Sequence, residues 1–186
     1  MSIHLIQFAN LYRDGEKMSM STRSGEFITL KSLADEIGPD AINFFYINKK
    51  IEQHLDFEIN TALSKDKDNP VYYIQYAHAR IEKIIQKVSL DNLNFDDREL
   101  IDPKEQELLR LLNSYVQTIE QAMDTLQPQL ITNYLYKLSQ SFHSYYANVK
   151  IIGEEINYSR VSLVMAVQKI LKNGLNLFDI SAPEDM

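Results

Sequence analysis

The sequence predicts a mainly α-helical protein, in which a helical bundle from about Pro70 follows a small α/β segment. Apolar residues recur at every third or fourth position over most of the chain after this point. Pro70, Pro103 and Pro128 stand at or just before the starts of three such stretches, where proline is well tolerated. Five glycines and five prolines among 186 residues favour long helices over tight all-β turns. We therefore divide the chain into two parts, residues 1–65 and residues 66–186.

The first part contains only short elements. Residues 3–12 (IHLIQFANLY) are apolar and partly alternating, and residues 13–16 place Asp-Gly at the centre of a turn, so we expect a strand and a hairpin. Residues 29–37 predict a short helix with Thr29 as its N-cap and Gly38 at its end, and the next proline starts another. None of these pieces closes a core of its own. We therefore expect residues 1–65 to be the edge of a larger unit.

Four helices are predicted in the second part. The first begins at Pro70, and its apolar stripe comprises Ile74, Ala77, Ile81, Ile84, Ile85 and Val88. After a polar loop over 91–102, a second helix opens at Pro103 and carries Leu108, Leu112, Tyr115, Ile119 and Met123 at core spacing. The third carries Ile131, Leu135, Leu138, Phe142, Tyr145 and Val149, and Gly153 breaks it. The fourth covers 160–171 with Gly174 as its C-cap, before an extended tail over 178–186.

A second stripe on the first helix has the chemistry of a single-stranded RNA reader. Its residues lie three or four positions apart: Tyr73, Tyr76, Arg80, Lys83 and Lys87. At about 100° per residue this stripe lies roughly 120° from the apolar one, so one face can pack while the other is exposed. Cations attract phosphate, and flat rings stack on unpaired bases. The residues alone equally allow a half-buried amphipathic face.

Composition excludes several classes of protein. The formal net charge of -7 argues against a nonspecific duplex-DNA binder, but a local basic patch for RNA stays possible. The absence of cysteine excludes disulfides, thiolate metal sites and cysteine nucleophiles. No apolar run approaches the ~20 residues of a membrane span, and the N-terminus does not resemble a signal peptide. Four widely separated histidines show no metal-ligand spacing. We expect a cytoplasmic monomer that binds neither a membrane nor a metal.

The loop over residues 17–25 (KMSMSTRSG) resembles the KMSKS loop of class I aminoacyl-tRNA synthetases, in the degenerate form of arginyl-tRNA synthetases. Two registers are open. Residues 17–21 match four of five positions, but residues 22–27 (TRSGEF) favour a register in which the motif comprises Ser19, Met20, Ser21, Thr22 and Arg23. The resemblance implies that this loop stabilises the triphosphate of ATP. Both registers lack the second lysine, so its contact would fall to Arg23, to Lys17 or to residues outside the chain.

The resemblance to a bacterial arginyl-tRNA synthetase covers essentially the whole chain. It rests on the strings LIQFANLYRDGEK, MSTRSGEF, GPDAINFFYINK, HLDFE and DNPVYYIQYAHAR. The terminal APEDM is similar to the family's APERM, with Asp185 in place of arginine. The resemblance implies that residues 66–186 form the family's anticodon-binding domain, of the DALR fold. Residues 1–65 would then be the C-terminal edge of the catalytic domain.

The resemblance also implies which residues contact RNA. Tyr73, Tyr76 and Arg80 reproduce the family's Y-x-x-Y-x-x-x-R pattern and are carried over as anticodon contacts. Lys83 and Lys87 lie outside the pattern and are expected to attract phosphate in general. Weaker candidates are Tyr136, with Lys137 beside it, and the terminal Met186. Core positions are expected instead for Tyr134 and Tyr145, and Asp185 disfavours phosphate contact at the chain end.

The chain lacks a HIGH motif and a βαβ series that could house one. We therefore expect a fragment of an ATP-dependent arginine–tRNA ligase, whose retained role is anticodon recognition. ATP with Mg²⁺, and arginine, would be substrates of the intact enzyme, and the fragment would bind no cofactor and form no arginyl-adenylate. The alternative is a free-standing, non-catalytic tRNA-binding module. The KMSKS-like loop favours the fragment, and the reading frame upstream of Met1 discriminates between the two.

Overall fold

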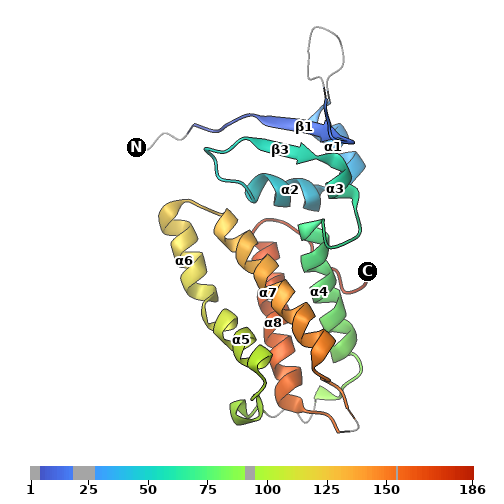
Figure 1. The fold of residues 1–186 in the computed structure, drawn as a ribbon, viewed down its shortest axis with the longest axis vertical. Coiled ribbons are helices and arrows are strands. Elements are labelled where there is room, and N and C mark those ends of the chain that lie inside the picture. The colour runs from blue at the N-terminus through green and yellow to red at the C-terminus, as the bar shows by residue number, and fades with distance from the viewer. Residues whose placement is uncertain (1–4, 19–27, 91–94, 154) are drawn as a thin grey trace.

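The computed structural model describes residues 5–18, 28–90, 95–153 and 155–186. A small three-stranded sheet with short helices lies at one end of the long axis, and a bundle of longer helices forms the rest (Figure 1). The prediction of a helical bundle after a small α/β segment is confirmed. The predicted boundary at residues 65 and 66 falls in the loop between α3 (Ile59–Leu63) and α4 (Pro70–Ile85). The division into two domains stays a prediction.

The sheet has the strand order β2-β1-β3, with β1 at Ala9–Arg13, β2 at Glu16–Lys17 and β3 at Leu55–Glu58. β1 and β2 form the predicted antiparallel hairpin. Its turn residues, Asp14 and Gly15, have φ angles of 55° and 77°, as a two-residue type I′ turn requires. β3 pairs with β1 in parallel and was not predicted.

The start of the first strand was predicted too early. β1 begins at Ala9, and the described apolar residues before it are exposed, with 84% of Phe8 accessible to solvent. In β3, by contrast, Leu55 and Phe57 are buried and Asp56 between them is exposed. This alternation shows that one face of the strand lies on the core, as expected for a half-buried strand.

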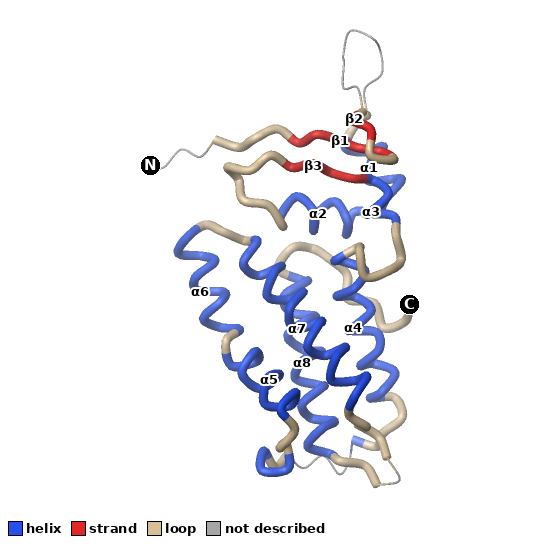
Figure 2. Tube along the Cα trace, in the orientation of Figure 1, coloured by secondary structure: helices blue, strands red, loops and turns tan. Residues whose placement is uncertain are grey.

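Three short helices cover the sheet and connect it to the bundle: α1 (Leu30–Ile37), α2 (Pro39–Ile47) and α3. As predicted, the Thr29 hydroxyl caps α1 by accepting a 3.0 Å bond from the Ser32 amide, and Gly38 ends it at a φ of 87°. Figure 2 shows α2 between the strands and the bundle. α2 contacts α4 and α7, and the Thr132 hydroxyl of α7 donates a 2.6 Å bond to the Asn48 side chain after α2.

The bundle consists of five helices: α4, α5 (Pro103–Asn113), α6 (Tyr115–Thr125), α7 (Gln129–Asn148) and α8 (Tyr158–Asn176). Polar side chains cap three of their N-termini. Asn69 caps α4, Asp102 with Glu105 forms a capping box on α5, and Asn157 caps α8. α4 packs against both α7 and α8, so its predicted apolar stripe lies in the core. None of the described helices is long and apolar enough to cross a membrane.

Two predictions about the second helix were wrong. It breaks at Ser114 into α5 and α6, because Ser114 serves as the cap of both. Met123 is 68% exposed, whereas its neighbour Ala122 is buried. The rest of the predicted stripe is confirmed, because Leu108 is buried and Leu112, Tyr115 and Ile119 pack against the core. The stripe on α7 is confirmed: from Ile131 to Tyr145 its residues are buried.

The end of the last helix was also predicted incorrectly. α8 continues past Gly174 to Asn176, so this glycine is not a C-cap. A Cβ atom at Gly174 would lie 2.5 Å from a methyl carbon of Leu135 on α7. Gly174 therefore leaves room for the Leu135 side chain where α8 packs against α7. α7 ends at Asn148, before Gly153, and the tail turns at residues 177–179 before it extends.

Candidate nucleic-acid interface

The predicted RNA stripe lies at the boundary between α4 and α7. The Tyr73 ring is 4.5 Å from the ring of His143 and 5.5 Å from that of Tyr136, both on α7. The Tyr76 ring also stacks on His143, with 5.7 Å between the ring centres. These tyrosines are half-buried, and burial raises the pKa of Tyr73. The stripe is thus an aromatic edge supported by a second helix.

Arg80 lies between two tyrosine rings. Its Cζ atom is 4.4 Å from the ring centre of Tyr76 and 4.9 Å from that of Tyr146. Its guanidinium also donates to the Tyr76 hydroxyl and, over 3.3 Å, to Nδ1 of His143. Within the described part of the chain, no carboxylate pairs with Arg80. Rings and a neutral nitrogen hold the cation in place, and its charge is not cancelled.

His143 fixes this arrangement without adding a charge. Its Nε2 lies 3.3 Å from the backbone oxygen of Tyr73, so it donates there, while Nδ1 accepts from Arg80. Burial, opposed by the hydrogen bond to the Tyr73 carbonyl and assisted by the Arg80 charge, lowers the pKa of His143 to about 4. His143 is therefore neutral at neutral pH. Its contacts with Tyr73 and Arg80 are structural.

The aromatic surface is longer than the sequence predicted. The Tyr72 ring stacks on Tyr76 at 6.1 Å with an interplanar angle of 10°, so Tyr72, Tyr76, Arg80 and Tyr146 form one continuous stack. Sequence reasoning missed Tyr72 as part of the site, although its spacing of four from Tyr76 was a usable signal. Tyr146 lies on α7, and no local pattern places it beside Arg80.

The C-terminal tail runs along α4 and ends at this stack. The Gln75 side chain donates to the Ser181 carbonyl over 3.0 Å. His78 is buried, and its Nδ1 donates to the Pro183 carbonyl over 2.8 Å. The Lys83 ammonium then pairs with Asp185 over 2.7 Å. Three successive contacts therefore tie residues 181–185 to α4.

This tail brings Met186 to the predicted RNA residues. A hollow of about 290 Å³ is lined by Tyr76, Ala79, Arg80, Lys83, Ile84, Lys87, Tyr146 and Met186. The pairing with Asp185 raises the pKa of Lys83 and lowers that of Asp185. The spacing predicted that Lys87 lies on the helix face. This was wrong, because α4 ends at Ile85 and Lys87 lies in the following turn.

The other residues singled out in the sequence lie in different parts of the structure. Tyr136 contacts Tyr73 and lies beside the stack, whereas Lys137 lines a different hollow with Pro103, Glu107 and Arg110. Tyr134 and Tyr145 are core residues, as predicted. The KMSKS-like motif, residues 19–23, lies outside the described residues. In the described ranges, no group of three or more His, Cys, Asp or Glu side chains could hold a metal ion.

Comparisons with known proteins agree with this picture. The family model of the DALR anticodon binding domain matches residues 74–186. An arginine–tRNA ligase of Thioalkalivibrio sulfidiphilus is 43% identical over 195 residues, which cover 100% of this chain and 33% of the relative. The chain thus spans about a third of the length of such relatives.

Solved structures give the same relationship. A protein of Campylobacter jejuni described as an arginyl-tRNA synthetase superposes with a TM-score of 0.89 at 32% identity, over 98% of this chain and 40% of that one. The arginyl-tRNA synthetase of Thermus thermophilus superposes with a TM-score of 0.75 at 25% identity, over 97% and 35%. The chain therefore belongs to the arginyl-tRNA synthetase family, of which it represents a part that includes the DALR anticodon-binding domain.

Proposed function

We propose that this chain recognises the anticodon loop of the tRNA for arginine, as part of an arginine–tRNA ligase. The observation that carries the proposal is Arg80, held between the rings of Tyr76 and Tyr146 with no carboxylate partner in the described ranges. A cation fixed beside partly exposed rings suits a strand whose bases are unpaired and whose phosphates are near.

Each part of the stack has a role in this proposal. Tyr73 and Tyr76 stack on splayed-out anticodon-loop bases, at about 1–3 kcal/mol per base. Arg80 donates to a phosphate or a base edge through its planar guanidinium, and its partners hold that plane in position. Met186 and Tyr136 border the same surface, and Lys83 and Lys87 attract the phosphate backbone. Attraction is local, because the whole chain has a net charge of -7.

The whole ligase would join arginine to this tRNA with ATP and Mg²⁺, in the cytoplasm and as a monomer. In that enzyme, residues 19–23 between β2 and α1 would contact the triphosphate of ATP. The present chain spans about a third of its relatives and lacks the HIGH motif. We expect it to form no arginyl-adenylate alone. Arginine-dependent ATP–pyrophosphate exchange by this chain would contradict that expectation.

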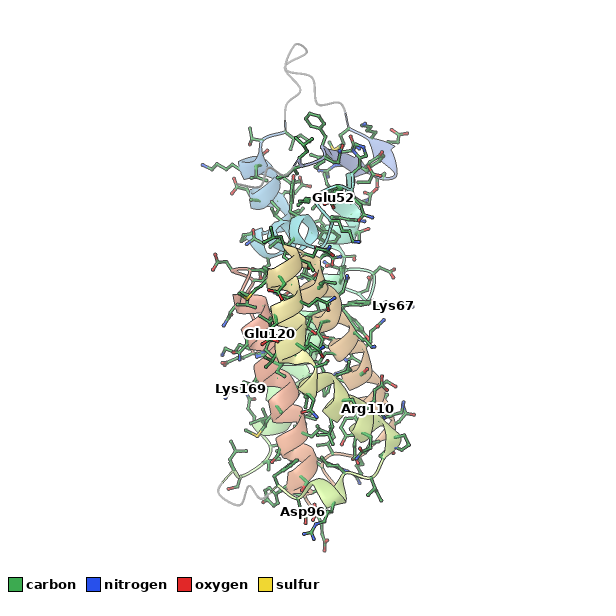
Figure 3. The ribbon with its side chains drawn as sticks, turned by 90° about the vertical axis from the view of Figure 1, so that its left-hand side faces the viewer. Glu52, Lys67, Asp96, Arg110, Glu120 and Lys169 are labelled. Atoms are coloured by element: carbon green, nitrogen blue, oxygen red, sulfur yellow. The ribbon has the colours of Figure 1, made fainter. Side chains whose placement is uncertain are left out.

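The RNA proposal is tested with an anticodon stem-loop of the tRNA for arginine. Replacing Tyr76 by Ala should weaken binding by about 1–3 kcal/mol, because one stacked base is lost. Replacing Arg80 by Ala should weaken binding and, if it contacts phosphate, flatten the salt dependence by about 0.7 in the log–log slope. Arg110→Ala on α5 (Figure 3), an exposed arginine that does not line the hollow beside Arg80, is the matched control. Unchanged affinity in correctly folded Tyr76 and Arg80 variants would refute the assignment.

A further inference from the structure

A second hollow adjoins the one that contains Met186. Its volume is about 420 Å³, and it is lined by Ile84, Lys87, Tyr146, Val149, Lys150, Ile151 and Ile152. Three of these residues, Ile84, Lys87 and Tyr146, also line the hollow beside Arg80. The two hollows therefore form one groove, which passes from the tyrosine stack around Tyr146 to the segment after α7. We call the second hollow, which residues 149–152 form with Ile84, Lys87 and Tyr146, the distal groove.

The distal groove has apolar walls and a cationic rim. Isoleucine and valine side chains and the half-exposed Tyr146 ring form its walls. Lys87 and Lys150 are both exposed, and neither forms an ion pair among the described residues. An apolar slot beside a ring accepts a flat base, and two uncompensated ammonium groups at its edge attract a phosphate.

The distal groove has a defined backbone. Arg160 of α8 donates a 3.0 Å bond to the carbonyl of Lys150, and this bond fixes the chain where it leaves α7. Ile151 is buried, and Ile152 pairs with Ile156 in an antiparallel bridge. Lys150 is therefore held near Lys87 and Tyr146 by contacts that do not involve its own ammonium group.

We propose that the distal groove binds a further unpaired nucleotide of the same RNA, with its base against Tyr146 and Ile152 and its phosphate on Lys87 and Lys150. This inference rests on the proposed function and extends it. Charge favours RNA as the occupant: Arg80, Lys83, Lys87 and Lys150 line the joined groove, and Asp185 is the acidic residue paired there. The continuity of the two hollows favours a neighbouring nucleotide of one strand.

The first test compares two lysine variants of the full chain in binding the anticodon stem-loop. Lys150→Gln should weaken binding several-fold and reduce the salt slope by about 0.7, because one phosphate contact is lost. Lys169→Gln on α8 removes the same charge from another surface (Figure 3) and should leave both quantities close to those of the unaltered chain. Circular dichroism of both variants checks that the fold is intact.

The second test places a photo-crosslinking amino acid, benzoylphenylalanine, at residue 152, and at Glu120 on α6 as control. Crosslinks from residue 152 alone to a nucleotide of the loop would support the distal groove. Equal effects of the two lysine variants and no crosslink at residue 152, with Arg80→Ala still impaired, would overturn this inference and leave the proposed function standing. Absence of any binding by the unaltered chain would overturn the proposed function itself.

Discussion

Two arginines join helices of this bundle, and their surroundings differ in one respect. Arg80 connects α4 with α7, and Arg160 connects α8 with α5. Both lie close to a tyrosine hydroxyl, Tyr76 in one cluster and Tyr145 in the other. Arg160 has a carboxylate partner, and Arg80 has none within the described ranges.

The Arg160 cluster is closed. Glu105 is 0% exposed and accepts a 2.8 Å bond from Arg160, a 3.1 Å bond from the Tyr145 hydroxyl and a 2.9 Å bond from the Asp102 amide. Burial and the Glu105 charge raise the pKa of Tyr145, so its hydroxyl stays protonated and donates. Every charge has a partner inside the protein, and the cluster can only serve the fold.

The Arg80 cluster is open. Its rings and its neutral histidine orient the guanidinium but do not neutralise it. Water beside a half-buried cation stabilises it in the absence of a counter-ion. An anion that binds there adds a favourable electrostatic interaction. Residue type alone therefore does not separate an arginine whose charge the fold neutralises from one whose charge is left uncompensated. What separates them is whether a carboxylate lies within reach.

The largest effect is expected when a substitution breaks the Arg160 cluster. Replacing Glu105 by Ala should lower the free energy of unfolding by about 3–5 kcal/mol, because Arg160 is left partly buried without its partner. Arg80→Ala should cost about 1 kcal/mol, since it removes a half-exposed cation–π contact. Urea unfolding followed by circular dichroism measures both. Similar costs for the two substitutions would mean that the clusters do not differ as described.

An intermediate effect depends on pH. His143 has a folded-state pKa of about 4 and an unfolded value near 6.5, so the unfolded chain binds more protons between these values. Its contribution to stability is complete above pH 6.5 and is lost as the pH falls towards 4. Because the ring is partly exposed and solvent screens part of the effect, we expect about 2 kcal/mol.

The measurement is the free energy of unfolding of the unaltered chain and of His143→Gln at pH 7 and pH 4.5. The difference between them should shrink at the lower pH. Exposed His54, replaced by Gln, is the matched control and should show no such change. A constant difference for His143 would show that its protonation is not coupled to folding.

Local sequence signals predicted the parts of the fold that local chemistry determines. The turn at Asp14 and Gly15, the cap at Thr29 and the helix starts at Pro70 and Pro103 depend on a few adjacent residues. β3 was missed because its pairing partner lies 46 positions earlier in the sequence. The hydrogen bond between Asn10 and Asp56 spans the same separation. Gly174 was misread because its reason, Leu135, lies on another helix.

The candidate site divides in the same way. Tyr73, Tyr76 and Arg80 share one helix, so their spacing and the family pattern identified them together. Tyr146 and His143 complete the cluster from α7, and the packing of α7 on α4 is a tertiary fact that periodicity does not contain. The position of Met186 likewise depends on contacts between the tail and α4.

The smallest effect is expected for Asp185, the carboxylate that pairs with Lys83 beside the Arg80 cluster. Asp185 pairs with Lys83, and both side chains are largely exposed, so an RNA phosphate can compete for the same ammonium group. Asp185→Asn should therefore strengthen binding of the anticodon stem-loop, by no more than about fivefold, and steepen its salt dependence. Glu184→Gln removes the same charge one position earlier, where no cation is paired, and should change less. If both variants improve binding equally, Asp185 acts only through the net charge of the tail, and Lys83 is no better placed for phosphate than any other exposed lysine.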